Sequence, residues 1–483
     1  MAGFRILDIA KPLQSVFPEV YFPYEAAPFD EKVIYTIFTG LIYLFLQQLP
    51  VAGYTPQGTI QEADQFYYLR NVFAMGAPHS VLEFGLFPII SSTIFMQLLS
   101  GLKLFKINYK KELERHRLQT LNKFFPLLIT FILTNLNIFV FKYYGSDLET
   151  TFLSKILINV QVLIGTLLSI LFVEVIDKGY GFQSGVLCLQ FMSYTTTFVN
   201  NILGVSNMPI DDKGNTEPQG SLVNFIGAFR NPNNTWTGAL VNAFSRSYLP
   251  NVTQMVFIAG IGALVIYWSH YRYELTIRST KMKNVTQVFP VKMLYTGGLS
   301  IFFTYSIIGF INVFLSTILT LVAPKFVNVD NNLLVLSFPF NLLLPPRSVF
   351  PDLLPNNILQ IIIFPIFFIG SCIWFSYNWM LLSGSAPSDL ASKFKEQGIT
   401  IQGKRESAVK QDLNKLISPA AISCGLVLGG LVAVGELIGL KGDAAGMVLA
   451  VASCFSLLEL IIYEFQQTGG KSMFASVLGG AGI

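Results

Sequence analysis

The chain has 483 residues, of which 52% are hydrophobic and only 12% are charged, with a formal net charge of +4. Soluble domains carry about 25% charged residues, so this composition excludes an ordinary soluble protein and predicts an all-α integral membrane protein. The four cysteines lie within apolar runs, and their spacing fits neither a metal site nor a disulfide framework. We therefore expect no metal and no cofactor.

Ten runs are apolar enough to form membrane-spanning helices, since a bilayer core takes about 20 apolar residues as a helix. They lie at 33–50, 81–100, 124–141, 152–175, 185–203, 252–269, 294–322, 358–382, 419–438 and 444–463. The second and fifth runs are short or interrupted by polar residues. A glycine-rich link, GLKGDAAG, joins the last two runs and predicts a helical hairpin there.

Lysine and arginine concentrate in alternate connections between these runs. Segment 103–123 carries seven, 270–292 carries five and 383–415 carries six, whereas the intervening loops carry few. Basic loops of membrane proteins stay in the cytosol. We therefore expect these three loops and both termini to be cytosolic, and the poorer loops to be lumenal.

The segment GAPHSVLEFGLFPIISSTIFMQLLSG, residues 76–101, is an unusual span because it begins with Gly, Pro and His and carries Glu83 one turn in. The polar segment before it predicts a short amphipathic helix, with four residues at helical spacing: Phe66, Leu69, Arg70 and Phe73. Two placements remain open for this segment, the lumenal surface or a fold back into a vestibule. The second explains the irregular start, because a helix that begins in a cavity tolerates polar residues.

Two of the basic loops contain predicted structure. Loop 268–292 alternates apolar and charged residues in RYELTIRST, as a hairpin strand does. Loop 383–415 has a helix N-cap at Ser388, a helical run to Gln397 that ends at Gly398, and then a strand-like turn, ITIQGKRES. A solvated loop would satisfy topology alone, but structured basic loops with interleaved Tyr and Phe suit phosphate backbones and indicate the ribosome.

No catalytic motif is found in the sequence, which lacks HExxH, a phosphate-binding loop and a GxSxG elbow. We therefore do not expect an enzyme. Acidic residues within or beside the spans keep a secondary transporter for a small solute open as the alternative function: Glu174, Asp177, Glu436, Glu459 and Glu464. The structured basic loops favour a ribosome receptor over a transporter.

Six motifs in order resemble the α-subunit of the Sec protein-conducting channel, the SecY family, in its eukaryotic Sec sixty-one form. They are LDIAKPLQSVFPEV, EFGLFPIISS, DKGYGFQSGV, YRYELTIRSTK, SGSAPSDLASKFKEQG and GKRE, and the likeness runs from residue 5 to about 465. Within the family the chain is most similar to a second, divergent channel type of yeast. The resemblance implies ten transmembrane helices in two pseudo-symmetric five-helix halves, 1–205 and 206–483, around a central pore with a lumenal plug at about 59–75.

Matching the motifs assigns the residues of the pore by resemblance. The constricting ring comprises Leu86, Ile90, Val186, Gln190, Phe302 and Leu449. Gln190 departs from a fully apolar ring. The plug residues are Phe66, Leu69 and Phe73.

The resemblance also assigns a lateral gate and a ribosome-docking surface. The gate positions are Leu133 and Phe310, both apolar where the family places a polar pair, with Asn135 as an alternative on the third span. The ribosome-binding residues are Arg272, Arg278, Lys404 and Arg405, and we expect Arg405→Glu to weaken ribosome binding in a salt-dependent way.

By the same resemblance, the chain conducts nascent polypeptides across the endoplasmic reticulum membrane and releases hydrophobic segments laterally into lipid. The expected partners are the ribosome, the nascent polypeptide, small single-span β and γ subunits, membrane lipid and, indirectly, the signal recognition particle pathway. With no ATP-binding motif in the sequence, translation or a partner must supply the work.

Overall fold

The computed structural model describes most of the chain. The described residues are 8, 10–15, 17–25, 27–53, 64–101, 111–144, 151–182, 184–209, 216–230, 236–244, 246, 249–279, 286–330, 333–346, 355–401 and 406–468. Lys404 and Arg405 lie outside these ranges, as does the first part of the predicted plug segment.

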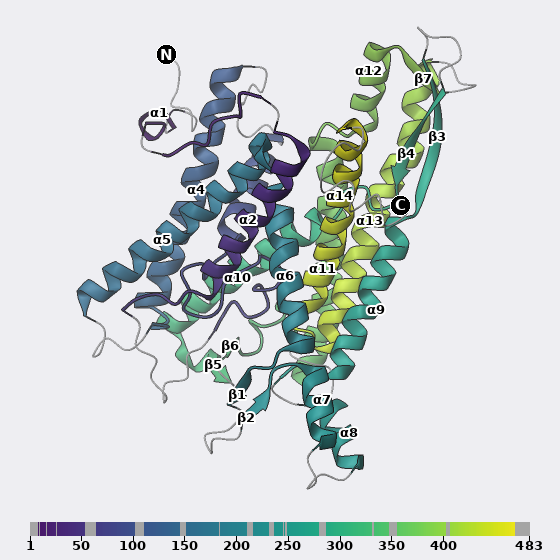
Figure 1. Cartoon of the computed structure of the whole chain (residues 1–483). Coiled ribbons are helices and arrows are strands. Elements are labelled where there is room, and N and C mark those ends of the chain that lie inside the picture. The colour runs from purple at the N-terminus through teal and green to yellow at the C-terminus, as the bar shows by residue number, and fades with distance from the viewer. Residues whose placement is uncertain are drawn as a thin grey trace.

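Each of the ten predicted apolar runs coincides with one long helix (Figure 1). These are α2 (Phe29–Gln48), α3 (Phe87–Gly101), α4 (Glu112–Phe139), α5 (Phe152–Val175), α6 (Gly185–Leu203), α9 (Val252–Ser269), α10 (Leu299–Val322), α11 (Pro355–Leu382), α13 (Glu406–Ile438) and α14 (Asp443–Thr468). Within the described residues, seven helices are long and apolar enough to cross a membrane, and α3 is a shorter apolar helix. The chain is a multi-pass membrane protein.

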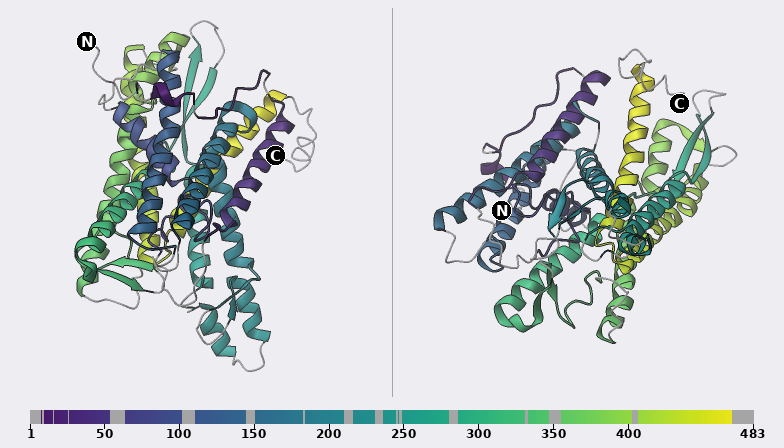
Figure 2. Two further views of the ribbon diagram at one scale, coloured as in Figure 1. Left: turned by 90° about the vertical axis from the view of Figure 1, so that its left-hand side faces the viewer. Right: turned by 60° about the horizontal axis from the view of Figure 1, so that its bottom comes forward.

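The helices surround one continuous hydrophobic core. Helix α4 packs between α3 and α5, α11 packs along α13, and α14 packs against α6 and α9. Figure 2 shows this bundle from two further directions. The core includes Tyr43, Phe87 and Phe302, whereas Phe38 and Ile366 on outer faces are 61% and 68% exposed. Large exposed apolar residues on the outside suit a surface that meets lipid.

The predicted basic loops form a small structured extension at one end of the bundle (Figure 1). Strand β3 (Arg272–Ser279) pairs antiparallel with β4 (Thr286–Lys292) on one side and with β7 (Ile399–Ile401) on the other. The predicted hairpin is therefore confirmed. This extension has its own core, to which Ile277, Phe394 and Leu413 contribute.

Helix α13 connects this extension to the membrane part. It has 33 residues, which correspond to about 50 Å at 1.5 Å per residue and exceed a bilayer core of about 30 Å. Its N-terminal part therefore stands outside the membrane and supports the basic loops.

Helix α12 (Pro387–Gln397) begins two residues earlier than predicted. The predicted N-cap at Ser388 is wrong, because the extended backbone of Ala386 precedes the helix and Pro387 occupies its first turn. The fixed φ of proline suits that position. The predicted end at Gly398 is confirmed, since this residue adopts a left-handed conformation with φ 66°.

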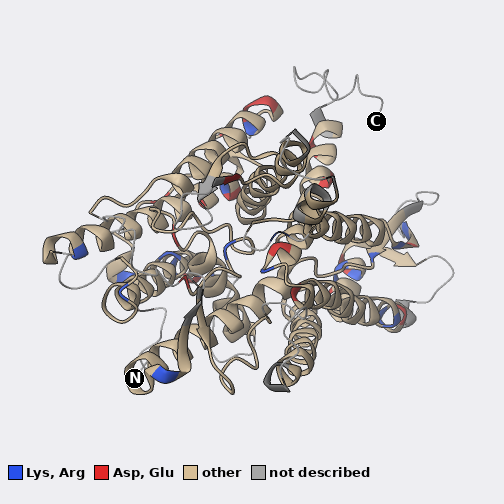
Figure 3. Ribbon diagram, turned by 90° about the horizontal axis from the view of Figure 1, so that it is seen from below, with Lys and Arg blue, Asp and Glu red and all other residues tan. Residues whose placement is uncertain are grey.

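The opposite end of the bundle carries shorter elements. They are β1 (Asn207–Pro209), β2 (Thr216–Pro218), α7 (Ser221–Arg230), α8 (Trp236–Phe244), the 3₁₀-helix η3 (Pro324–Phe326), β5 (Val327–Asp330) and β6 (Leu333–Leu336). Two further short elements are α1 (Ala10–Leu13), which packs on α4, and the π-helix η2 (Ile176–Tyr180) after α5. Viewed along the bundle, charged positions are sparse among apolar and neutral ones (Figure 3).

Candidate translocation pore and plug

The segment before α3 folds back into the bundle, as the second of the two predicted placements requires. Phe66, Leu69 and Phe73 are at most 2% exposed. The predicted amphipathic helix is wrong, because the described residues 64–86 form successive turns without a regular helix. The amide of Leu69 donates a hydrogen bond to the carbonyl of Phe66 at 2.8 Å, and the amide of Phe73 donates one to the carbonyl of Leu69 at 3.0 Å. Most side chains of the segment are buried in the protein, so the solvated polar face of an amphipathic helix is not needed.

Glu83 lies at the centre of a buried polar cluster, which explains the irregular start of the second span. Glu83 is 1% exposed, and its carboxylate accepts hydrogen bonds from the Arg70 guanidinium at 3.0 Å and the His79 amide at 2.9 Å. Arg70 also pairs with Asp64 at 2.6 Å. The polar residues therefore face one another inside the protein, and none of this cluster has to enter lipid.

The charges in this cluster stabilise one another. Burial opposes the charge on Arg70, but the carboxylates of Asp64 and Glu83 outweigh it and raise the pKa of the guanidinium well above its ordinary value. Burial and the neighbouring Glu83 raise the pKa of Tyr144 well above its ordinary range. The Tyr144 hydroxyl therefore stays protonated and donates to Glu83 Oε2 at 3.2 Å.

Helices α2 and α6 fix the end of the plug segment. Ala74 has φ 47°, and its carbonyl accepts hydrogen bonds from the Tyr43 hydroxyl at 2.7 Å and from Gln47 Nε2 at 2.6 Å. Gln47 also donates to Ser193 Oγ on α6 at 2.9 Å. A Cβ at Gly85 would lie 2.3 Å from the Ala74 carbonyl oxygen, so the close return of the chain requires glycine at this position.

A second polar cluster fixes the plug to the C-terminal helices. Asn71 donates to the Asp443 side chain at the start of α14, and the Tyr194 hydroxyl donates to the Asp443 carbonyl at 2.9 Å. Nearby, Glu436 accepts from the Tyr305 hydroxyl and from the Gly442 amide, both at 2.8 Å. These bonds give Glu436, a sequence candidate for an ion pathway, a structural role.

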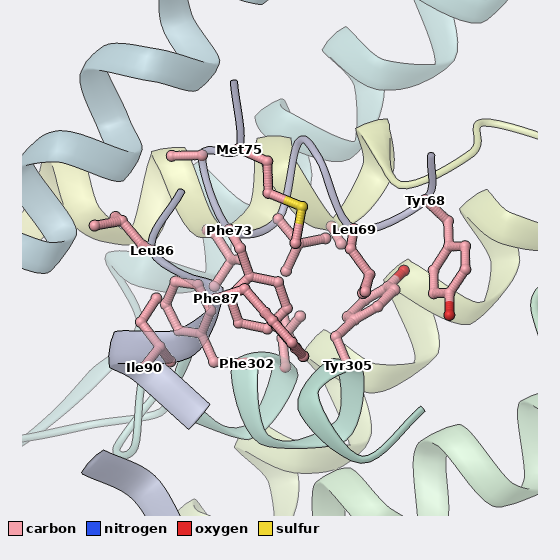
Figure 4. Close-up of a cluster of buried hydrophobic side chains, with 14 of the residues drawn as sticks. Tyr68, Leu69, Phe73, Met75, Leu86, Phe87, Ile90, Phe302 and Tyr305 are labelled. Atoms are coloured by element: carbon pink, nitrogen blue, oxygen red, sulfur yellow. The ribbon is translucent and has the colours of Figure 1, made fainter. Parts of the chain in front are cut away.

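Most residues of the predicted ring are buried, and the plug packs against them. Leu86, Ile90, Phe302 and Leu449 are at most 4% exposed, and Figure 4 shows Phe73 of the plug among Leu86, Phe87, Ile90 and Phe302. The ring of Phe73 lies 5.0 Å from that of Phe87 and 5.7 Å from that of Phe302. Such aromatic contacts make the closed centre of the bundle apolar and densely packed.

Gln190 is the polar exception that the sequence predicts. It is fully buried on α6, and neither its Oε1 nor its Nε2 has a hydrogen-bond partner among the described residues. An unpaired buried amide costs about 1–3 kcal/mol. The closed centre therefore carries an internal destabilising group.

A cavity of about 520 Å³ opens next to this constriction. Four of the predicted ring residues line it, namely Ile90, Val186, Phe302 and Leu449. Within the described lining, the charged residues are Lys292 and Glu459, which form an ion pair. Lys292 ends β4, so the cavity lies on the side of the basic loops.

The two predicted gate residues lie in apolar surroundings. Leu133 is 3% exposed. The ring of Phe310 lies 5.2 Å from that of Phe87 and 5.8 Å from that of Phe95. The alternative, Asn135, accepts a hydrogen bond from Asn159 on α5 at 3.1 Å, so it engages α5 instead of α10.

Both predicted arginines of the first basic loop lie on β3 and are exposed. Arg272 lies 3.2 Å from Glu274, and both side chains are more than half exposed. Such an exposed pair is weak, so Arg272 remains available to an anionic partner.

A cavity that ends at an apolar constriction, with the protein's own chain folded beneath it, defines a channel-type membrane protein. The SecY family profile matches residues 80–458. The chain is 42% identical to the Saccharomyces cerevisiae protein named Sec sixty-one protein homolog, over 99% of each chain. The chain belongs to the SecY family, as its motifs indicate, and is a transport channel, not an enzyme. This relative also confirms the predicted likeness to the second channel type of yeast.

Solved structures agree with this assignment. A yeast Ssh1 complex bound in the idle state to the yeast 80S ribosome matches with a TM-score of 0.75 and 40% identity, covering 99% of both chains. A structure described as a protein-conducting channel matches with a TM-score of 0.75 and 20% identity over 95% of this chain and 97% of its own. At that identity the second match supports the fold alone.

Proposed function

We propose that this chain is the pore-forming α-subunit of a channel that conducts nascent polypeptides across the endoplasmic reticulum membrane. The observation that carries the proposal is the cavity lined by four residues of the predicted ring, together with the plug segment that packs against one of them, Phe302. The yeast relatives, at 42% and 40% identity, support this function over a small-solute transporter.

The apolar constriction provides the seal. An apolar ring blocks ions because water is excluded from it, whereas a polypeptide can push the flexible side chains of the ring apart. The plug must move from its place beside Phe87 and Phe302 before a chain can pass. Translation by a bound ribosome supplies the work.

The basic extension serves as the ribosome-docking surface, with Arg272, Arg278, Lys404 and Arg405 as its binding residues. The exposed positions of Arg272 and Arg278 on a rigid hairpin support this role. The extension is then cytosolic, as are both termini. Small single-span β and γ subunits complete the complex, and the signal recognition particle pathway delivers ribosomes to it.

Two five-helix halves, 1–205 and 206–483, enclose the pore as ten transmembrane helices. The lateral gate opens between α3 and α4 on one side and α10 and α11 on the other, so that hydrophobic segments reach lipid. Contacts of α3 with both α10 and α11 support this location.

Reconstitution tests the function. The purified complex is placed in proteoliposomes and supplied with ribosomes that translate a radiolabelled secretory precursor. We expect the precursor to become protected from protease, and a precursor without its signal sequence to remain accessible. Equal accessibility of the two precursors would contradict the proposal.

A further inference from the structure

Gln65, at the start of the described plug segment, joins two helices from opposite halves of the chain. Its Nε2 donates to Asn137 Oδ1 on α4 at 2.9 Å. On the other side, Ser316 Oγ of α10 donates to Gln65 Oε1 at 3.3 Å, and Asn312 Nδ2 donates to the Gln65 carbonyl at 3.2 Å. One plug residue thus connects α4 to α10.

All members of this group are removed from solvent. Gln65 is 3% exposed, Asn137 2%, Asn312 3% and Ser316 0%. In an apolar interior, a polar group that loses its partner pays the full cost of desolvation. Separating α4 from α10 while the plug stays in place therefore leaves at least one of these groups unpaired.

The neighbouring residue holds Gln65 in position. The Asp64 carbonyl accepts a hydrogen bond from the Leu334 amide of β6 at 3.2 Å, and its carboxylate pairs with Arg70. The backbone next to Gln65 is therefore held in place by Asp64, in addition to the hydrogen bonds of Gln65 itself.

On α10, the residues that bind Gln65 lie close to a predicted gate residue. Asn312 and Ser316 follow Phe310, the apolar gate residue, by two and six residues on the same helix. The gate thus has an aromatic part around Phe310 and a separate polar part, and the second includes the plug itself.

We propose that Gln65 is a latch that couples the plug to the lateral gate and sets how hydrophobic a segment must be to leave the channel. This inference rests on the proposed function. While Gln65 is hydrogen-bonded to both Asn137 and Ser316, it holds the gate helices α4 and α10 together. When the plug moves away, these hydrogen bonds break and the two helices can separate. A segment must therefore offer enough apolar contact with lipid to offset the loss of these bonds.

The test measures membrane insertion of segments with graded numbers of leucine and alanine, in the full complex with ribosome-bound nascent chains. Gln65→Met keeps the length of the side chain but removes both side-chain hydrogen bonds. The midpoint is the number of leucines at which half of the segments insert. We expect it to fall by about two leucines, given the usual free energies of a hydrogen bond and of inserting a leucine into lipid. Ser316→Ala, which removes one bond, should shift it in the same direction by about half as much.

Thr166→Val is the matched control. It removes a buried hydroxyl hydrogen bond at 3.1 Å between Thr166 on α5 and Thr130 on α4, so it leaves the bonds between α4 and α10 in place, and its midpoint should equal that of the wild type. A midpoint unchanged by Gln65→Met and Ser316→Ala, in channels that still translocate a secretory chain, would overturn the latch and leave the channel function intact. Loss of translocation in the wild type would instead refute the proposed function.

Discussion

Replacing Arg70 by methionine should release the plug. Arg70 neutralises Asp64 at 2.6 Å and Glu83 at 3.0 Å, and the Glu83 side chain is 1% exposed. Removing one partner of a buried ion pair costs about 3–5 kcal/mol, because the remaining charge stays buried without compensation. Since 1.4 kcal/mol corresponds to a factor of ten, 3 kcal/mol shifts the closed-to-open equilibrium by about two orders of magnitude.

The assay is ion conductance of the purified channel in a planar bilayer without ribosomes. Arg70→Met should raise the open fraction, whereas Lys11→Met should not, because the Lys11 pair with Asp8 is exposed and worth less than about 1 kcal/mol. The double variant Arg70→Met/Glu83→Gln should recover part of the closure, since it removes one uncompensated charge. Wild-type conductance in Arg70→Met would refute the view that this cluster fixes the plug.

Further substitutions test the other parts of the channel. Arg278→Glu should weaken ribosome binding in a cosedimentation assay, most strongly at low salt, while Lys325→Glu at the opposite end should not; equal losses would contradict a docking role. Phe310→Asn removes ring contacts with two phenylalanines, so graded Leu/Ala segments should insert at lower hydrophobicity; an identical threshold would contradict a role for the apolar Phe310 in setting the hydrophobicity that the gate requires. Gln190→Leu replaces an unpaired buried amide, so it should raise the thermal stability of the closed channel by an amount equivalent to about 1–3 kcal/mol; a less stable channel would contradict the unpaired state. Asn233, Asn234 and Thr235 form an N-x-T glycosylation sequon in the loop 204–250, one of the lysine- and arginine-poor loops that we expect to be lumenal. Asn233 should therefore carry an endoglycosidase-sensitive glycan, and its absence in cells that glycosylate a control sequon would count against the orientation.

The helices were predictable because their signal is local. Each predicted apolar run overlaps one helix, although the helix of the second run begins at Phe87 and not at residue 81, and the alternating pattern of RYELTIRST became a strand. Hydrophobic length and alternation depend on adjacent residues alone. The basic loops could therefore be located, and Arg272 and Arg278 are exposed on β3, while their binding to the ribosome stays a prediction.

The plug was only partly predictable. The irregular start of the second span favoured a placement of the plug segment inside the protein, and Phe66, Leu69 and Phe73 are buried there. Their helical spacing predicted a helix wrongly, because the actual backbone depends on distant hydrogen bonds such as Tyr43 to Ala74. No short-range pattern joins Gln65 to Ser316, which lies 251 residues away. A signal was nevertheless present, since amides and acids inside an apolar sequence must find partners in the folded state.

Photo-crosslinking reports whether a translocating polypeptide touches the constriction of the channel. A photoreactive residue replaces Ile90 in the ring or, as the control, Phe38 on the outer face of α2, which is 61% exposed. Ribosomes stalled on a radiolabelled secretory chain are then added. We expect a crosslink at Ile90 that depends on the signal sequence and none at Phe38. The absence of a crosslink at Ile90 while ribosomes still bind would contradict the channel function, because the protein would then bind ribosomes without conducting a polypeptide.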